Sequence, residues 1–167
     1  MANVHCDEEK LYQRIADENI TIHPFVWDTL YLYIGDYISA INCIAFYYTE
    51  KNEPVPIVDG HKILRYTRIM NEIVDKILHP EKMGKEKERL EKIKNEQMLM
   101  HGVVRELVSH YISNDIMGIN LIVSFYLDPL GPGPIPVEDT KKLLGYTQSM
   151  NAFLDKFRKA TFKAKGC

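Results

Sequence analysis

The feature that most constrains this chain is an internal repeat. At an offset of 78, residues 8–48 align with 86–126, and at an offset of 80, residues 54–78 align with 134–158. These stretches share at least 22 identities in 66 aligned positions, whereas random pairing would give about 4 or 5. The offset changes in a Pro/Gly-rich loop, where insertions are tolerated. The sequence therefore predicts two tandem copies of one structural unit.

Each copy is predicted to hold three helical pieces, which span 7–16, 24–48 and 59–78 in the first copy and 85–94, 101–127 and 139–159 in the second. Pro24 suits a first helical position, where a missing N–H costs nothing. Asp59 and Asp139 follow Pro-x-Pro and are predicted as N-caps. One apolar face recurs at helical spacing in the third piece, formed by Ile63, Thr67, Met70, Val74 and Ile77.

These pieces predict an all-α chain whose four-helix-bundle core comes from two tandemly duplicated helical units. We expect one domain over residues 1–167, with repeats at about 7–78 and 85–158. Short connectors favour antiparallel neighbours, which leaves the short first helices outside the core. The segment 79–97 alternates in charge and is predicted to be a solvated crossover helix.

Composition narrows the function classes. The chain is 46% hydrophobic, which supports a sizeable core, and its net charge of −2 gives no reason to expect a nucleic-acid partner. Three cysteines without ligand spacing and a first segment without a secretory pattern predict a cytoplasmic protein. Residues 25–48 reach membrane-spanning length, but Asp28 and Asp36 would each cost several kcal/mol in lipid. We therefore expect a buried helix of a soluble protein and no membrane span.

Polar residues interrupt the two apolar second helices in register. Asp28, Gly35, Ser39 and Asn42 form one stripe at helical spacing, and their counterparts are Glu106, Ser113, Met117 and Asn120. Two such stripes meeting at an internal pseudo-two-fold axis would make a polar seam. The seam could fix helix register, as buried Asn residues do in coiled coils. It could instead line a cavity for a small ligand or a metal, or face solvent.

His23 and His101 are the histidines matched between the copies, and each lies at the start of a second helix. They could stand near the mouth of the seam, or simply cap and pack at the helix entries. Glu-x-x-His, His-x-x-x-His, phosphate-loop and nucleophile-elbow patterns do not occur in the sequence. These absences favour a non-catalytic protein, and the residues name no cofactor.

Tyrosines are abundant, with five of the ten on the second helix of the first copy. Tyrosine is favoured at interfaces, and that helix is apolar on nearly every side. The first functional hypothesis is therefore a non-catalytic binding module that self-associates as a homodimer. The alternative is a small-ligand or metal sensor that uses Asp28, Glu106, Asn42, Asn120, His23 and His101.

Overall fold

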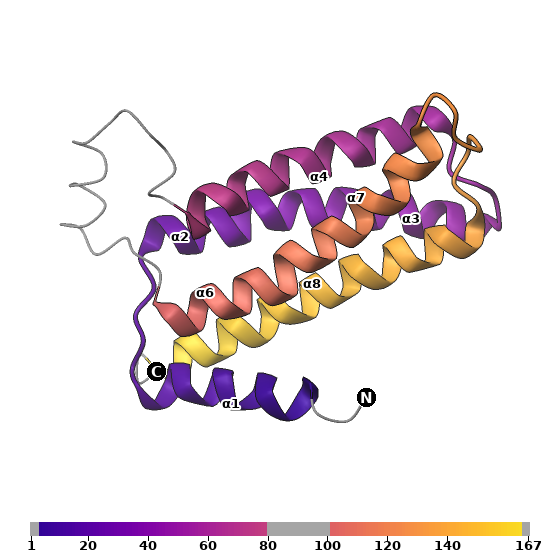
Figure 1. Ribbon diagram of the computed structural model, residues 1–167. Helices are drawn as coiled ribbons and strands as arrows, with labels where there is room; N and C mark the ends of the chain where they lie inside the picture. Colours follow the sequence, from indigo (N-terminus) through magenta and orange to yellow (C-terminus); the bar gives the residue numbers. More distant parts are fainter. Residues whose placement is uncertain (1–3, 80–100, 165–167) are drawn as a thin grey trace, which may run out of the picture.

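The computed structural model describes residues 4–79 and 101–164 (Figure 1). The described chain is helical apart from its connecting loops and one isolated β-bridge, so the predicted all-α class is confirmed. The elements are α1 (Val4–Asp17), α2 (Pro24–Asp28), η1 (Thr29–Ile34), α3 (Gly35–Lys51), α4 (Ile57–Leu78), α6 (Gly102–Val108), η3 (Ser109–Ser113), α7 (Asn114–Leu127) and α8 (Val137–Ala164). The predicted helix 85–94, and the crossover from residue 80 onward, lie outside the described residues.

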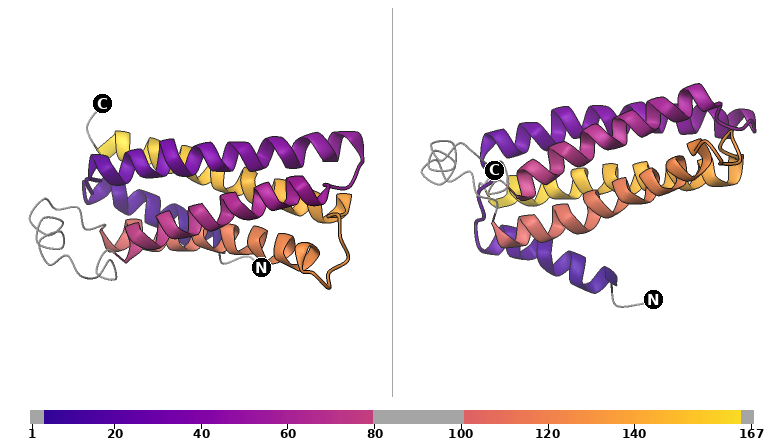
Figure 2. Two further views of the ribbon diagram at one scale, coloured as in Figure 1. Left: turned by 90° about the horizontal axis from the view of Figure 1, so that it is seen from above. Right: turned by 45° about the horizontal axis from the view of Figure 1, so that its top comes forward.

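The long helices pack mainly on helices from the other half of the sequence. Helix α3 packs most extensively on α8, and α4 packs most extensively on α7. Contacts between α3 and α4 and between α7 and α8 complete a ring of four neighbouring helices. Figure 2 shows these long helices lying side by side. Helix α1 lies outside this set, against α8 and α6.

Helix α4 confirms the predicted apolar face, because Ile63, Thr67, Met70, Val74 and Ile77 are all buried. The predicted N-cap at Asp59 is wrong. Pro56 is extended and caps the helix, which begins at Ile57, so Asp59 lies in the first turn. Asp139 likewise lies inside α8, which begins at Val137. The reason is that Pro56 supplies a fixed φ suited to a helix start, three residues before the predicted side-chain cap.

Both second helices contain a π-helical segment near their first third. Segment η1 joins α2 to α3, and η3 joins α6 to α7. In η1 the N–H of Gly35 bonds to the carbonyl of Leu30, five residues earlier. π-Helical segments are rare, and each one rotates the residues that follow relative to an ordinary α-helix. The side-chain stripes of these helices therefore change direction at the segment.

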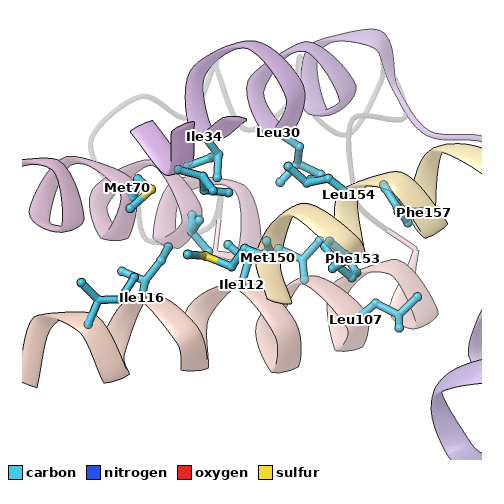
Figure 3. Close-up of a cluster of buried hydrophobic side chains, with 14 of the residues drawn as sticks. Leu30, Ile34, Met70, Leu107, Ile112, Ile116, Met150, Phe153, Leu154 and Phe157 are labelled. Carbon is cyan, nitrogen blue, oxygen red and sulfur yellow. The ribbon is translucent and has the colours of Figure 1, made fainter. Parts of the chain in front are cut away.

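The core lies between the four long helices and is almost entirely apolar (Figure 3). Its fully buried members include Leu30, Ile34, Met70, Ile112, Ile116 and Met150. Each such side chain contributes roughly 1.5–3 kcal/mol on burial. The second helix of each copy nevertheless keeps an outer face that is exposed to solvent. Exposed Asp36 and Cys43 show this for α3. The buried helix predicted over 25–48 is therefore buried only on its inner sides, where it has neighbours.

The two Pro-x-Pro loops meet at one end of the molecule. Val55 and Ile135 exchange backbone hydrogen bonds of 2.9 and 3.0 Å and form an isolated antiparallel bridge. Both side chains are fully buried. These residues correspond at the offset of 80, so matched positions pair with each other. The bridge therefore ties the α3–α4 loop to the α7–α8 loop.

Candidate interaction surface

The outer face of α7 carries a stripe of exposed apolar side chains. Met117, Leu121 and Phe125 are 53%, 66% and 63% exposed, at a spacing of four residues that places them along one side of the helix. Exposed Asn114 lies seven residues before Leu121 and exposed Asp128 seven residues after it. We call these five residues the α7 face. It is an apolar patch with a polar residue at each end.

Between its two polar ends, the α7 face lacks the charges that an exposed helix normally carries. Residues 116–127 contain no Asp, Glu, Lys or Arg. Helix α4, by contrast, exposes His61, Lys62, Arg65 and Arg68 over a similar length. Surface helices of globular proteins ordinarily place charged residues opposite the core. A contiguous apolar patch with a polar rim is typical of an interaction site.

The counterpart face on α3 is more polar. Ser39, Cys43 and Tyr47 correspond to Met117, Leu121 and Phe125 at the offset of 78, and all three are exposed. Exposed apolar residues do occur nearby, namely Leu32, Tyr33 and Phe46. The sequence prediction of uncovered apolar surface on this helix therefore agrees with the exposure of these residues. Residues 37–49 of this helix are also free of Asp, Glu, Lys and Arg, so α7 is distinguished by its row of three large apolar side chains.

The continuous helix Val26–Lys51 is long and apolar enough to cross a membrane, judged by length and composition alone. About a third of its most apolar window is buried within the molecule. Ile34, Ile38 and Ile41 are fully buried against other helices. Asp28 and Asp36 on the same helix are exposed.

The predicted acidic ends of the polar seam do not lie in the interior. Asp28 and Glu106 are both exposed. The predicted stripe from Asp28 to Asn42 assumes ordinary α-helical spacing, and η1 interrupts that spacing. Because a π-helical turn holds more residues, Asp28 and Asn42 leave the common line. The two acids therefore do not face each other across an internal axis.

The predicted asparagines lie at helix contacts but make different bonds. Oδ1 of Asn42 accepts a 2.8 Å hydrogen bond from the hydroxyl of Thr147, which joins α3 to α8. Oδ1 of Asn120 accepts a 3.4 Å bond from Ser124 of its own helix. Thr147 is fully buried. Asn42 is thus a predicted seam residue that bonds to the other half of the chain, through Thr147, which was not among the predicted residues.

The matched histidines lie at the helix entries. Nδ1 of His101 accepts a 3.3 Å hydrogen bond from the N–H of Val103, which makes His101 the N-cap of α6. His23 is half-buried, and its carbonyl accepts a bond from the N–H of Trp27. The capping alternative is therefore the one that the structure supports for His101. Neither histidine is paired with the acids Asp28 or Glu106 in a common site.

Two matching Tyr–Asp–Lys groups stand at the loop end and were not predicted as a unit. Tyr48 donates a 2.6 Å bond to Asp59, which accepts a 2.7 Å bond from Lys62. The second group is Tyr126, Asp139 and Lys142, with two bonds of 2.5 Å. Each tyrosine lies near the end of one helix and each aspartate in the first turn of the next. The groups therefore clamp the α3–α4 and α7–α8 hairpins.

The electrostatics of these groups indicate a structural role. The bonds from Lys62 and then from Tyr48 hold the pKa of Asp59 below its usual value, and Lys142 and Tyr126 do the same to the pKa of Asp139. The bond to Asp59 raises the pKa of Tyr48 to about 12. Acid–base catalysis needs pKa values near the working pH. These shifts move the pKa values of the aspartates and of the tyrosines further from neutral pH.

Asp115 is the one described carboxylate with an unbonded buried oxygen. Burial raises its pKa, against the bond from Ser149 of α8 and the charge of His110, which lower it. Its Oδ2 atom is buried and has no hydrogen-bond partner within residues 4–79 and 101–164. Its counterpart in the first half is Tyr37. Asp115 stands beside the α7 face rather than in it.

The sequence did hold signals for these features. Tyr48, Asp59 and Lys62 are all identical to their counterparts in the repeat alignment, so the alignment could have marked the clamp. The four-residue spacing of Met117, Leu121 and Phe125 could have marked the α7 face. Within the described ranges, no group of three or more His, Cys, Asp or Glu side chains is placed to hold a metal ion.

Searches of protein-family models, curated proteins and solved structures found no match to this chain.

Proposed function

We propose that this protein is a non-catalytic helical interaction module that self-associates as a homodimer. The observation that carries the proposal is the α7 face, where Met117, Leu121 and Phe125 are more than half exposed on a run without charged residues. Covering this face removes apolar surface from water, at about 25 cal/mol per Å². The contact is thus driven by the hydrophobic effect.

The proposal includes an origin for the scaffold. We infer that a tandem duplication produced two three-helix units, and that their long helices form one four-helix bundle with a pseudo-two-fold axis. Matched features support this inference: the π-helical segments η1 and η3, the two Tyr–Asp–Lys clamps, and the Val55–Ile135 bridge between corresponding residues. Insertion of a π-helical segment at nearly the same place twice is improbable for unrelated helices.

Within this scaffold the seam residues have a structural role. The Asn42–Thr147 bond satisfies two polar groups at the α3–α8 contact. A buried polar pair of this kind penalises a shifted alignment, since a shift would remove this bond from Asn42 and leave Thr147 with only its bond to the carbonyl of Leu144 on its own helix. We assign it to register rather than to ligand binding, because the exposed acids and the capping His101 leave it without further polar groups.

The proposal also treats Val26–Lys51 as a helix packed within a cytoplasmic protein rather than as a membrane span. Its buried isoleucines already face other helices. Exposed Asp28 and Asp36 would each cost several kcal/mol in the hydrocarbon region. Exposed Cys43 is compatible with a reducing compartment.

Light scattering on a dilution series of the intact chain tests the proposal. At micromolar concentration we expect a molar mass of twice 19.4 kDa, which falls toward 19.4 kDa on dilution. A constant mass of 19.4 kDa at every concentration would rule out self-association. Elemental analysis of the same sample tests the metal-sensor alternative, which requires a stoichiometric metal.

A further inference from the structure

Resting on the proposed self-association, we infer that the dimer is closed by one contact, in which the α7 face packs antiparallel on the α7 face of a second copy about a two-fold axis at Leu121. The occupant of the face is thus a second molecule of this same chain. Three properties of the face support this arrangement: its symmetry about Leu121, its charge pattern and the polarity of its counterpart on α3.

The α7 face is symmetric about its middle residue. Met117 and Phe125 each lie four residues from Leu121, and Asn114 and Asp128 each lie seven residues from it. In an antiparallel pair centred on Leu121, each Met117 therefore faces the Phe125 of the second copy. Asn114, Leu121 and Asp128 follow a heptad spacing, with Met117 between them. Two helices that pack through residues at this spacing cross at a shallow angle of about 20°.

Charge decides between antiparallel and parallel pairing. Oδ1 of Asp128 accepts a 2.8 Å bond from the N–H of Leu130, and an antiparallel pair sets the other carboxylate oxygen opposite the amide of Asn114 in the second copy, where a hydrogen bond can form. A parallel pair would set the two Asp128 carboxylates opposite each other, and like charges repel. Antiparallel helix dipoles are also favourably arranged.

The polar counterpart face prevents an open-ended assembly. Helices α3 and α7 both contact α4 and α8, so α3 and α7 occupy opposite corners of the ring (Figure 2). A contact from the α7 face to the α3 face of the next copy would be heterologous and would build a chain without end. Ser39 and Cys43 replace Met117 and Leu121 on that face. The α3 face therefore lacks the apolar stripe that such a contact needs.

The flanking surfaces must also contribute to the dimer. A standard interface buries about 800 Å² per partner, more than three side chains can supply. Leu130, in the loop after α7, is 97% exposed. Antiparallel pairing brings each Leu130 past the N-terminal end of α7 in the second copy, which extends the apolar contact beyond the stripe.

Spin-label distances test the arrangement. One sample carries the label at Asn114→Cys with Cys6, Cys43 and Cys167 changed to Ser, and a control carries it on native Cys43 with only Cys6→Ser and Cys167→Ser. Asn114 is at the edge of the face and Cys43 is exposed on α3. At a rise of about 1.5 Å per residue, antiparallel pairing separates the two Asn114 positions by roughly 21 Å along the helices.

We expect this separation for the Asn114 label, and no short distance for the Cys43 label. A short Asn114 distance of about one helix diameter, roughly 10 Å, would indicate parallel pairing and overturn the inference. A short Cys43 distance would place the contact on α3 and would also overturn it. Light scattering could show a dimer while the Asn114 labels lie much further apart than about 21 Å. That result would contradict this inference and leave the proposed function standing. A wild-type sample that is purely monomeric would contradict both.

Discussion

The hydroxyl of Thr147 donates a 2.8 Å hydrogen bond to Oδ1 of Asn42, and this bond joins helix α8 to helix α3. The corresponding residues at the α4–α7 contact, Thr67 and Asn120, do not bond to each other in this way. Thr67, like Thr147, donates to a carbonyl of its own helix, and Asn120 accepts from Ser124 of its own helix rather than from a threonine of α4. Only one of these two corresponding pairs therefore joins separate helices.

Removal of this bond should destabilise the fold more than removal of its counterpart. We expect Asn42→Ala to lower the free energy of unfolding by about 1 kcal/mol, because the buried hydroxyl of Thr147 loses one of its two partners and keeps the carbonyl of Leu144. Asn120→Ala is the matched control and should cost less. Urea unfolding monitored by circular dichroism measures both. Equal losses in the two variants would show that the bond between the halves contributes nothing special.

The two Tyr–Asp–Lys clamps should contribute equally to stability. We expect Tyr48→Phe and Tyr126→Phe each to cost about 0.5 to 1 kcal/mol near pH 7, because each removes one hydrogen bond to an ionised aspartate. Urea unfolding of the two variants and of the double variant measures these costs. An effect confined to one variant would contradict the equivalence of the two hairpins.

The clamps should also fail in acid. The pKa values of Asp59 and Asp139 are lowered in the folded chain, so each carboxylate stabilises the fold above about pH 4. That contribution is lost as the pH falls through the lowered pKa values. Unfolding free energies measured between neutral and acid pH should therefore converge for the wild type and the double variant Tyr48→Phe/Tyr126→Phe. Parallel curves would mean that the tyrosine bonds do not depend on aspartate charge.

Asp115 should respond to pH in the opposite direction. Burial raises its pKa in the folded chain, so its ionised form opposes folding at neutral pH, and this penalty is relieved as the pH falls through the raised pKa. Asp115→Asn should therefore raise stability near pH 7, by less than about 1 kcal/mol because the side chain is half-exposed. Exposed Asp155→Asn is the control and should not stabilise. Thermal unfolding at neutral and acid pH decides, and a destabilised Asp115→Asn variant would contradict this reading.

Two glycines on the α7–α8 side should behave differently. A Cβ atom at Gly118 would lie 2.5 Å from Cζ of Tyr146, whereas one at Gly145 would meet nothing within 4 Å. We expect Gly118→Ala to destabilise by about 1 to 3 kcal/mol through overpacking. Gly145→Ala should stabilise by about 0.5 to 1 kcal/mol, because alanine is the better helix former. Melting temperatures of both variants test this, and a stable Gly118→Ala variant would mean that the ring of Tyr146 moves aside freely.

Much of the fold could be predicted from the sequence because helix periods and turn residues are local signals. The apolar positions of α4 from Ile63 to Ile77 followed directly from a spacing of three and four residues. Pro24 and the Pro-x-Pro loops marked helix starts to within two residues. Repetition strengthened these predictions, since each signal occurred twice.

The actual positions of the predicted seam residues could not be derived from the sequence, because periodicity assumes one helix geometry throughout. The π-helical segment η1 lies between Asp28 and Asn42 and breaks their alignment. The hydrogen-bond partner of Asn42 depends on how the two halves pack, and no local pattern states which threonine it meets. His101 was placed correctly at a helix entry, and its capping bond was one of the alternatives that the sequence left open.

The most direct measurement compares two lysine substitutions at corresponding positions, Leu121→Lys on α7 and Cys43→Lys on α3, by sedimentation equilibrium at micromolar concentration. Both residues are exposed, so both variants should keep wild-type helix content. Our account predicts that Leu121→Lys sediments at 19.4 kDa and that Cys43→Lys, like the wild type, sediments at twice that mass. A Leu121→Lys variant that remains a dimer would contradict the assignment of the interface to the α7 face.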